Sequence, residues 1–293
     1  MSSEILSEKG RAKRPGRWKP VKGTRELAVL HISVFLLILI GIMIVGSRIP
    51  SDSIYVDLEQ INQPPSLRHL FGTDWVGRDM LTRTVKGLSL SIWVGIICSL
   101  VSTLIAVFFG ILGPTLGGKA DALVSWLVDL TLSVPHTILI ILISIACGGG
   151  FKGIVAGVAA THWTSLTRII RAEVMRINTA EYVRASKQFG KSHWYIARNH
   201  LLPHVIPQMV VGTVLVFPHA ILHEASITFL GFGLPPHEPA IGVILSESMK
   251  YLTSGQWWLA FFPGLCLIMV SMMVSALGKS LERIMNPSTA YKI

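Results

Sequence analysis

Apolar segments long enough to cross a bilayer constrain this chain of 293 residues more than any other feature. A helix needs about 20 mainly apolar residues to span the hydrocarbon layer. Six segments approach or exceed that length, at about 28–46, 88–113, 122–146, 153–167, 205–230 and 257–278. Only 14% of the residues are charged, against roughly 25% in a soluble domain. The sequence therefore predicts an all-α integral membrane protein with six transmembrane helices rather than a soluble enzyme.

The lysines and arginines are distributed unevenly among the segments that join these helices. Nineteen of the 26 lie in 1–27, 113–121, 168–204 and 279–293, and the other seven lie in the remaining connections. An excess of Lys and Arg marks the cytoplasmic side of a membrane protein. The pattern predicts that both chain ends are cytoplasmic, and it explains the net charge of +10 without a nucleic-acid partner.

The predicted organisation is one helical bundle with short polar additions. Residues 1–27 form a basic cytoplasmic segment, 28–46 the first helix, and 47–87 an extracytoplasmic segment. Residues 88–280 form a core of five helices, and 281–293 a cytoplasmic tail. The first helix is expected to stay uncleaved, because its apolar stretch of 19 residues exceeds the roughly 7–15 of a signal peptide.

The cytoplasmic stretch at 181–207 has an unusual pattern, EYVRASKQFGKSHWYIARNHLLPHVIP. Residues 181–189 have helical composition, and Gly190 interrupts them. Ser192 can cap a second short helix, which is expected to end before Pro203. The first helix carries apolar side chains at helical spacing, namely Tyr182, Ala185 and Phe189. Two short helices bent at a glycine are suited to docking into a groove of a partner protein.

This stretch resembles the coupling motif of binding-protein-dependent ABC importer permeases, EAA-x3-G-x9-I-x-LP. The glycine and the Leu-Pro pair keep the motif's spacing, whereas Arg184, Ser186 and His200 replace its Glu, Ala and Ile. The resemblance assigns contact with the ATPase to a segment at 181–203. Its candidate residues are Glu181, Arg184, Ala185, Ser186, Gly190, His200, Leu202 and Pro203.

Two further segments strengthen the resemblance. LFGTDWVGRDMLTRTVKGLSLSIWVG at 70–95 is similar to the GTDxxGRDxxSRxxxGxxxSL signature of the peptide and nickel branch of this family. HEASITFLGFGLPPHEPAIGVIL at 223–245 is similar to that branch's EAxLSFLGLGxxPPxPxWG segment, although its Trp is lost and Ile241 stands there instead. Across residues 28–287 the chain looks most like the second, C-type permease subunit of dipeptide, oligopeptide or nickel importers.

The resemblance implies a fold, a set of partners and a location. The fold is a type I ABC importer permease-like bundle in a prokaryotic inner membrane, surrounded by lipid. The partners are a related second permease, two ATPase subunits and an extracytoplasmic solute-binding protein. The chain itself is expected to be non-catalytic and to bind no cofactor, with ATP and Mg bound by the partner subunits. GPTLGGKA at 113–120 nearly matches a P-loop, but Ala120 replaces the Ser or Thr that holds Mg²⁺.

Charged and polar side chains inside the apolar segments are candidates for the translocation path. Such groups usually face a cavity, the bundle interior or a partner. The candidates are Asp129, His162, His219, His223 and Glu224. Asp129 can instead pair with Arg168 or Arg171, and Glu224 can have a structural role. Pro135 can kink the third helix.

The histidines also permit a metal hypothesis. His219 and His223 lie one helical turn apart, which can direct two imidazoles toward a soft divalent cation, and His162 could join them. Hydrogen bonding across helices is the alternative. His223 and Glu224 begin an HExxH pattern, but Ile227 replaces the second histidine, so a zinc protease is not expected.

The alternative function class is a stand-alone secondary transporter or channel. Many secondary transporters contain internal inverted repeats, and none is visible in this sequence. A secondary transporter also has no need for the docking segment at 181–203. A membrane enzyme is a third class, but the sequence contains no nucleophile elbow, metal motif or Gly-rich cofactor loop. The sequence does not distinguish peptide from nickel chelate as cargo.

Overall fold

The computed structural model of the chain describes residues 24–50 and 56–285, and its long elements are all α-helices. The long helices are α1 (Thr24–Arg48), α2 (Met80–Leu116), α3 (Gly118–Ser133), α4 (His136–Ala146), α5 (Gly150–Asn178), α8 (Leu202–Phe229) and α10 (Trp258–Met285). The short ones are η2 (Leu58–Gln60), α6 (Glu181–Gln188), α7 (His193–Ile196), η3 (Ala197–Leu201) and α9 (Ile241–Leu252). Most of the predicted basic segment, residues 1–23, and the last part of the predicted tail, 286–293, lie outside the described residues.

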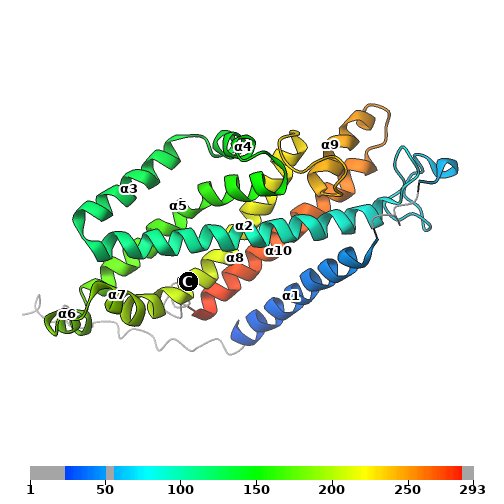
Figure 1. Cartoon of the computed structure of the whole chain (residues 1–293). Helices are drawn as coiled ribbons and strands as arrows, with labels where there is room; N and C mark the ends of the chain where they lie inside the picture. Colours follow the sequence, from blue (N-terminus) through cyan, green and yellow to red (C-terminus); the bar gives the residue numbers. More distant parts are fainter. Residues whose placement is uncertain (1–23, 51–55, 286–293) are drawn as a thin grey trace, which may run out of the picture.

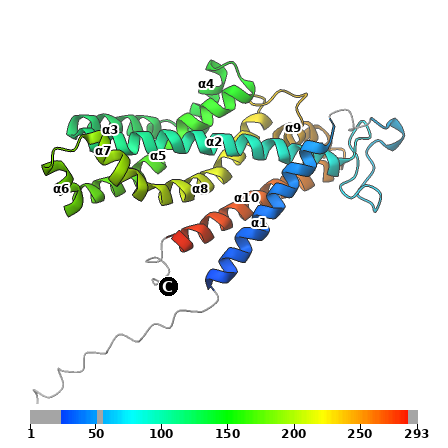
Figure 2. The same cartoon turned by 60° about the horizontal axis from the view of Figure 1, so that its bottom comes forward.

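The long helices form one elongated bundle with distinct ends. Figures 1 and 2 show α6 and α7 at one end. After the motif that they resemble, residues 181–203 are called the coupling segment and this end the coupling end. At the other end lies the cap, defined as residues 56–79 together with α9. Helices α2 and α8 run from the coupling end toward the cap, and α1 and α10 pack beside them.

Four stretches of the described chain are long and apolar enough to cross a membrane: α1 from Val29, α2, His193–Phe229 and α10. The pair α3 and α4 makes a fifth if it is counted as one bent span. Helix α5 is 29 residues long but falls outside this set. The membrane-protein class is therefore supported, and the number of six spans stays a prediction.

The third predicted span is bent more sharply than a kinked helix. Helices α3 and α4 meet at 99°. Pro135 has no N–H to donate, and it restricts Val134 to an extended conformation, observed at φ −98° and ψ 136°. The helix therefore ends at Ser133, and α4 restarts when Leu139 N–H bonds to the Pro135 carbonyl at 3.1 Å.

Helix α5 lies inside the bundle. It packs against α2, α4 and α8. A Cβ on Gly153 would lie 2.6 Å from the Ser144 carbonyl oxygen, and one on Gly157 would lie 2.7 Å from the Ile140 carbonyl oxygen. Only glycine permits this approach of α5 to α4, and it lets a helix with few large apolar side chains pack closely.

The replacement Gly157→Leu tests this contact. It is expected to destabilise the bundle by about 1–3 kcal/mol or more, because the side chain would force α4 away from α5. The measurement is the apparent melting temperature of the complex in detergent. Gly41→Leu on α1 is the matched control, because no neighbouring element of the described structure lies within 4 Å of the added Cβ. Equal melting temperatures for the two variants would show that the close approach is not needed.

Candidate functional site

The coupling segment consists of the two short helices that the sequence predicted. Helix α6 ends at Gln188 with Phe189 as its C-cap, and Gly190 then takes φ +72°, a left-handed conformation that favours glycine. The Ser192 side chain caps α7 by accepting a hydrogen bond from Tyr195 N–H at 3.2 Å. The glycine and the capping serine therefore set the angle between α6 and α7.

The predicted end of the second helix before Pro203 is wrong. Helix α7 continues through the π turn η3 into α8, so that His193–Phe229 is one helical stretch. Leu202 N–H bonds to the Ala197 carbonyl, five residues back. The wider turn accommodates Pro203, which has no N–H and would clash with the preceding turn of a regular α-helix. Pro203 is then the second residue of α8, where proline is tolerated.

Two residues that depart from the family motif are bonded to each other. Ser186 Oγ lies 2.9 Å from His200 Nε2, which joins α6 to the π turn. The His200 ring also makes edge-on contacts with Tyr182 and Tyr195, at centroid distances of 5.6 and 5.9 Å. The loss of the motif's Ala and Ile is thus matched by a new polar contact between α6 and the base of α8.

The coupling segment has an anchored side and an outward side. Val183, Ile196 and Leu201 are buried in one apolar cluster with residues of α5. Phe189 and Trp194 are 81% and 76% exposed, and Tyr182 is exposed as well. Glu181, Arg184 and Pro203 are also exposed, whereas Ala185 and Leu202 are half-buried. The predicted apolar face of α6 therefore points mainly away from the bundle.

Asp129 forms an ion pair that joins α3 to α5. Its Oδ1 lies 2.6 Å from Nη2 of Arg168, and both side chains are more than half exposed. Arg171 pairs with Asp121 instead. Of the alternatives that the sequence left open for Asp129, the pairing with Arg168 is the one present in this conformation.

Glu224 is buried, and its contacts fit the structural role that the sequence left open beside a role in the path. Its side chain is 0% exposed between α8 and its neighbours. Thr228 Oγ1 donates to its Oε1 at 3.0 Å, and the same hydroxyl accepts Leu234 N–H at 3.2 Å. Glu224 therefore helps to hold the loop after α8 against the helix.

The three candidate histidines come together, and a fourth joins them. The His162 ring on α5 lies 5.0 Å from His223 and 6.3 Å from His219, centroid to centroid. His136, the first residue of α4, lies 5.4 Å from His162 and 6.4 Å from His223. We call these four residues the histidine cluster. Sequence reasoning missed His136 because the bend at Pro135, which brings it to α5 and α8, was expected only as a kink.

The histidine cluster is not arranged as a metal site. Within residues 24–50 and 56–285, no three His, Cys, Asp or Glu side chains are placed to hold a metal ion together. Thr161 Oγ1 lies 3.0 Å from His162 Nδ1. The metal hypothesis for His219 and His223 therefore receives no support from this geometry.

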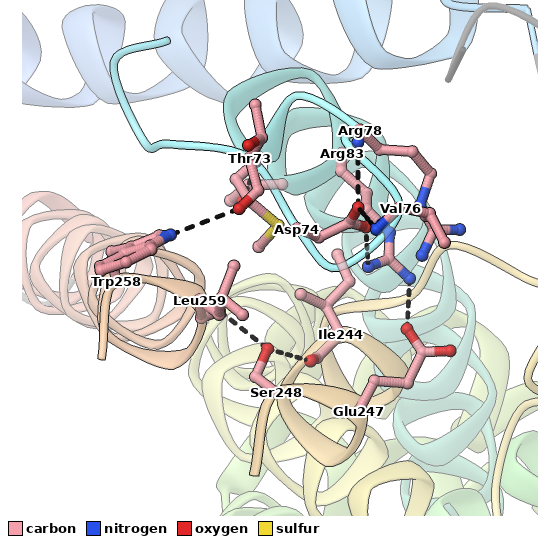
Figure 3. Close-up of polar contacts among 12 residues, drawn as sticks. Thr73, Asp74, Val76, Arg78, Arg83, Ile244, Glu247, Ser248, Trp258 and Leu259 are labelled. Carbon is pink, nitrogen blue, oxygen red and sulfur yellow. Dashed lines mark hydrogen bonds and ion pairs between the residues drawn. The ribbon is translucent and has the colours of Figure 1, made fainter. Parts of the chain in front are cut away.

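The cap is held by a buried charge network that sequence reasoning did not assign (Figure 3). Asp74 is 0% exposed. It accepts Arg78 Nε at 2.6 Å and Arg83 Nη1 at 3.1 Å, and also the N–H groups of Val76 and Arg78. Arg83 Nη2 donates in addition to Glu247 of α9. One arginine thus connects the loop before α2 to α9.

A second set of contacts ties the cap to α10. The Trp258 indole N–H points to the Thr73 carbonyl at 3.4 Å, and Ser248 Oγ donates to the Leu259 carbonyl at 2.9 Å (Figure 3). Trp75 stacks on Tyr251 at a centroid distance of 4.7 Å. The GTDxxGRD signature at 70–95 marks this region in the sequence. It does not identify the residues of α9 and α10 that the region contacts.

Comparisons with known proteins identify the family of this chain. Residues 102–289 match the family model for the binding-protein-dependent transport system inner membrane component. The chain is 30% identical to the dipeptide transport system permease protein DppC of Bacillus subtilis, over 98% of this chain and 91% of that protein. It is 28% identical to the probable D,D-dipeptide transport system permease protein DdpC of Escherichia coli, over 98% and 99%.

Solved structures support the same fold. A chain of the MetNI methionine ABC transporter, in an inward-facing conformation, aligns with a TM-score of 0.57 at 18% identity, covering 71% of this chain and 98% of that one. A chain of an amino acid ABC transporter crystallised with histidines aligns with a TM-score of 0.52 at 15% identity, covering 69% and 94%. The protein belongs to the binding-protein-dependent inner membrane components, which are the non-catalytic permease subunits of ABC importers.

Proposed function

We propose that this chain is a permease subunit of a prokaryotic ABC importer that carries di- or oligopeptides into the cell. The names of the curated relatives support peptides as cargo. The observation that carries the proposal is the coupling segment, which is anchored to α5 by buried residues and exposes Phe189 and Trp194. A transporter driven without a separate ATPase has no use for such a segment.

The proposed mechanism is alternating access with no covalent chemistry in this chain. ATP-driven closure of two partner ATPase subunits moves α6 and α7. The Ser186–His200 hydrogen bond and the continuous helix from His193 carry this movement into α8. Because α8 packs on α2, α5 and α10, its tilt rearranges the bundle around the path. ATP and Mg are bound by the partners.

The other partners follow from the two ends of the molecule. We infer that a solute-binding protein meets the cap and that a related second permease completes the path. Figure 2 draws the start of α1 and the end of α10 close together and away from the cap. That arrangement supports the inference that both termini lie on the cytoplasmic side with the coupling segment. In this view the permease sits in the inner membrane and is surrounded by lipid.

Co-purification in mild detergent, followed by mass spectrometry, tests the proposal. The tagged chain is expected to bring down two ATPase subunits, a second permease and a solute-binding protein. The binding protein is then screened with dipeptides, oligopeptides and nickel chelates. If the binding protein binds a nickel chelate and no peptide, the cargo is a metal chelate and the peptide proposal is wrong. A chain that purifies alone and still transports solute would make it a secondary transporter.

The double replacement Phe189→Ala and Trp194→Ala tests the docking surface. It is expected to reduce the ATPase subunits recovered with the permease at least tenfold, because large aromatic side chains dominate interface energies. Leu67→Ala is the matched control, since Leu67 is 100% exposed in the cap at the opposite end. Unchanged recovery with the aromatic variant would place the ATPase contact elsewhere.

A further inference from the structure

The histidine cluster lies on a part of the bundle that is otherwise almost free of ionisable groups. Helix α4, residues 153–167 of α5, and α8 contain no Lys, Arg or Asp. Their one carboxylate, Glu224, is buried and bonded to Thr228. Apart from His204 at the coupling end, the histidines of the cluster are therefore the ionisable residues with exposed surface on these helices.

The imidazoles of the cluster keep hydrogen-bonding capacity for a ligand. His219 is exposed, and His136, His162 and His223 are half-buried. His162 shares a hydrogen bond with the Thr161 hydroxyl. Within the described residues, no other hydrogen bond to a side chain is seen for the four histidines. Polar groups at membrane depth are costly unless they face a water-filled cavity, a partner or a ligand. Four such groups on three helices indicate a surface that meets a polar ligand.

We propose that the histidine cluster contacts the terminal carboxylate of the peptide as it passes through the permease. This inference rests on the function proposed above. Every peptide carries that carboxylate whatever its side chains are, so one site can serve many sequences. Imidazole N–H groups donate charge-assisted hydrogen bonds to a carboxylate. Histidine binds a carboxylate less tightly than a buried arginine does. Weak binding suits a transporter, because the peptide must be released again as it passes through.

The experiment compares two changes, one in the protein and one in the peptide. The complete complex, with its binding protein, is reconstituted in liposomes, and ATP-driven uptake of a dipeptide and of its C-terminal amide is measured. The protein change is His219→Leu with His223→Leu. For each peptide, uptake by the variant is divided by uptake by the wild type. The same binding protein delivers the peptide in both cases, so its own preference between the two peptides cancels, as in a double-mutant cycle.

The expected result is a loss of uptake confined to the free carboxylate. The leucine variant should take up the free dipeptide about tenfold more slowly than the wild type, with little change for the amide. His219→Gln with His223→Gln keeps an N–H donor on each side chain and should restore most of the uptake. Uptake of the free dipeptide by the leucine variant and by the glutamine variant can also be compared directly. This comparison tests the need for an N–H donor without using the amide.

The controls separate a ligand contact from a packing role. His31→Leu on α1 makes the same change on a helix that packs on α2 and α10, away from the cluster, and should have no effect. The melting temperature of each complex shows whether it is folded. If the double variant is unstable, His219→Leu alone is used, because His219 is exposed.

Specific outcomes would overturn the inference. Equal losses for the free peptide and the amide, or equal losses in the leucine and glutamine variants, would exclude a carboxylate contact. Inhibition of the wild type by Ni²⁺ alone that disappears in the leucine variant would make the cluster a metal site. If the wild type takes up no peptide at all, the proposed function itself fails. Normal peptide uptake by both wild type and variants would refute only the histidine cluster's role.

Discussion

Replacing Asp74 with alanine is expected to destabilise the folded permease by about 3–5 kcal/mol. The side chain has no exposed surface, and it accepts hydrogen bonds from Arg78 and Arg83. Arg83 is itself buried, so removing Asp74 leaves a guanidinium in the interior whose remaining ion pair within residues 24–50 and 56–285 is with Glu247. Removing one partner of a buried ion pair costs more stability than the intact pair contributes. The remaining charge stays buried, without its partner and without water around it.

The consequence should extend beyond the loop that contains Asp74. Arg83 connects residues 56–79 to α9, and Trp258 and Ser248 connect the same cap to α10. Loss of the network should therefore loosen the whole cap and lower the recovery of the complex with its solute-binding protein. The measurement is the melting temperature in detergent together with the yield of assembled complex.

Glu59→Ala is the matched control, since Glu59 is an exposed carboxylate in the same cap. Surface substitutions of this kind usually change stability by less than about 0.5 kcal/mol. A melting temperature for the Asp74 variant equal to that of the Glu59 variant would show that the buried network does not stabilise the cap.

The parts of the fold that depend on local sequence could be predicted. Runs of apolar residues predicted most of the long helices. Gly190 and Ser192 gave the break and the cap between α6 and α7, because a left-handed residue and an N-cap act over a few residues. The bend at Pro135 was foreseen as a kink, but a proline alone does not say whether a helix continues or restarts at 99°.

The parts that depend on distant partners could not be predicted. Arg83 meets Glu247 across 164 positions, and His136 reaches His223 only because α4 turns back over α5. The continuation through Pro203 was also missed, since proline ordinarily ends a helix and the π turn that permits it leaves no signature in composition. For Glu224 the sequence left a role in the path and a structural role open, because its burial depends on packing against neighbouring elements.

Replacing Gly190 with tryptophan is expected to abolish ATP-driven uptake while leaving insertion into the membrane intact. Gly190 has φ +72°, and a non-glycine residue in this region costs about 1–2 kcal/mol. Apart from its two chain neighbours, no atom of the described residues lies within 4 Å of a Cβ added at this position. The permease can therefore fold around the new side chain, but the indole would project from the turn between α6 and α7, where the ATPase is proposed to dock.

A series at this position separates backbone strain from obstruction. Asn tolerates the left-handed conformation and is small, so Gly190→Asn should retain most of the uptake. Gly190→Ala adds strain with little bulk and should reduce uptake several-fold, whereas Gly190→Trp adds both and should reduce it at least tenfold. Uptake is normalised to the amount of permease in the membrane and compared with ATP hydrolysis by the complex. Normal uptake by a well-expressed tryptophan variant would refute the coupling role of this turn. Equal losses in the alanine and tryptophan variants would assign the effect to strain, because obstruction of a docking surface must increase with the size of the side chain.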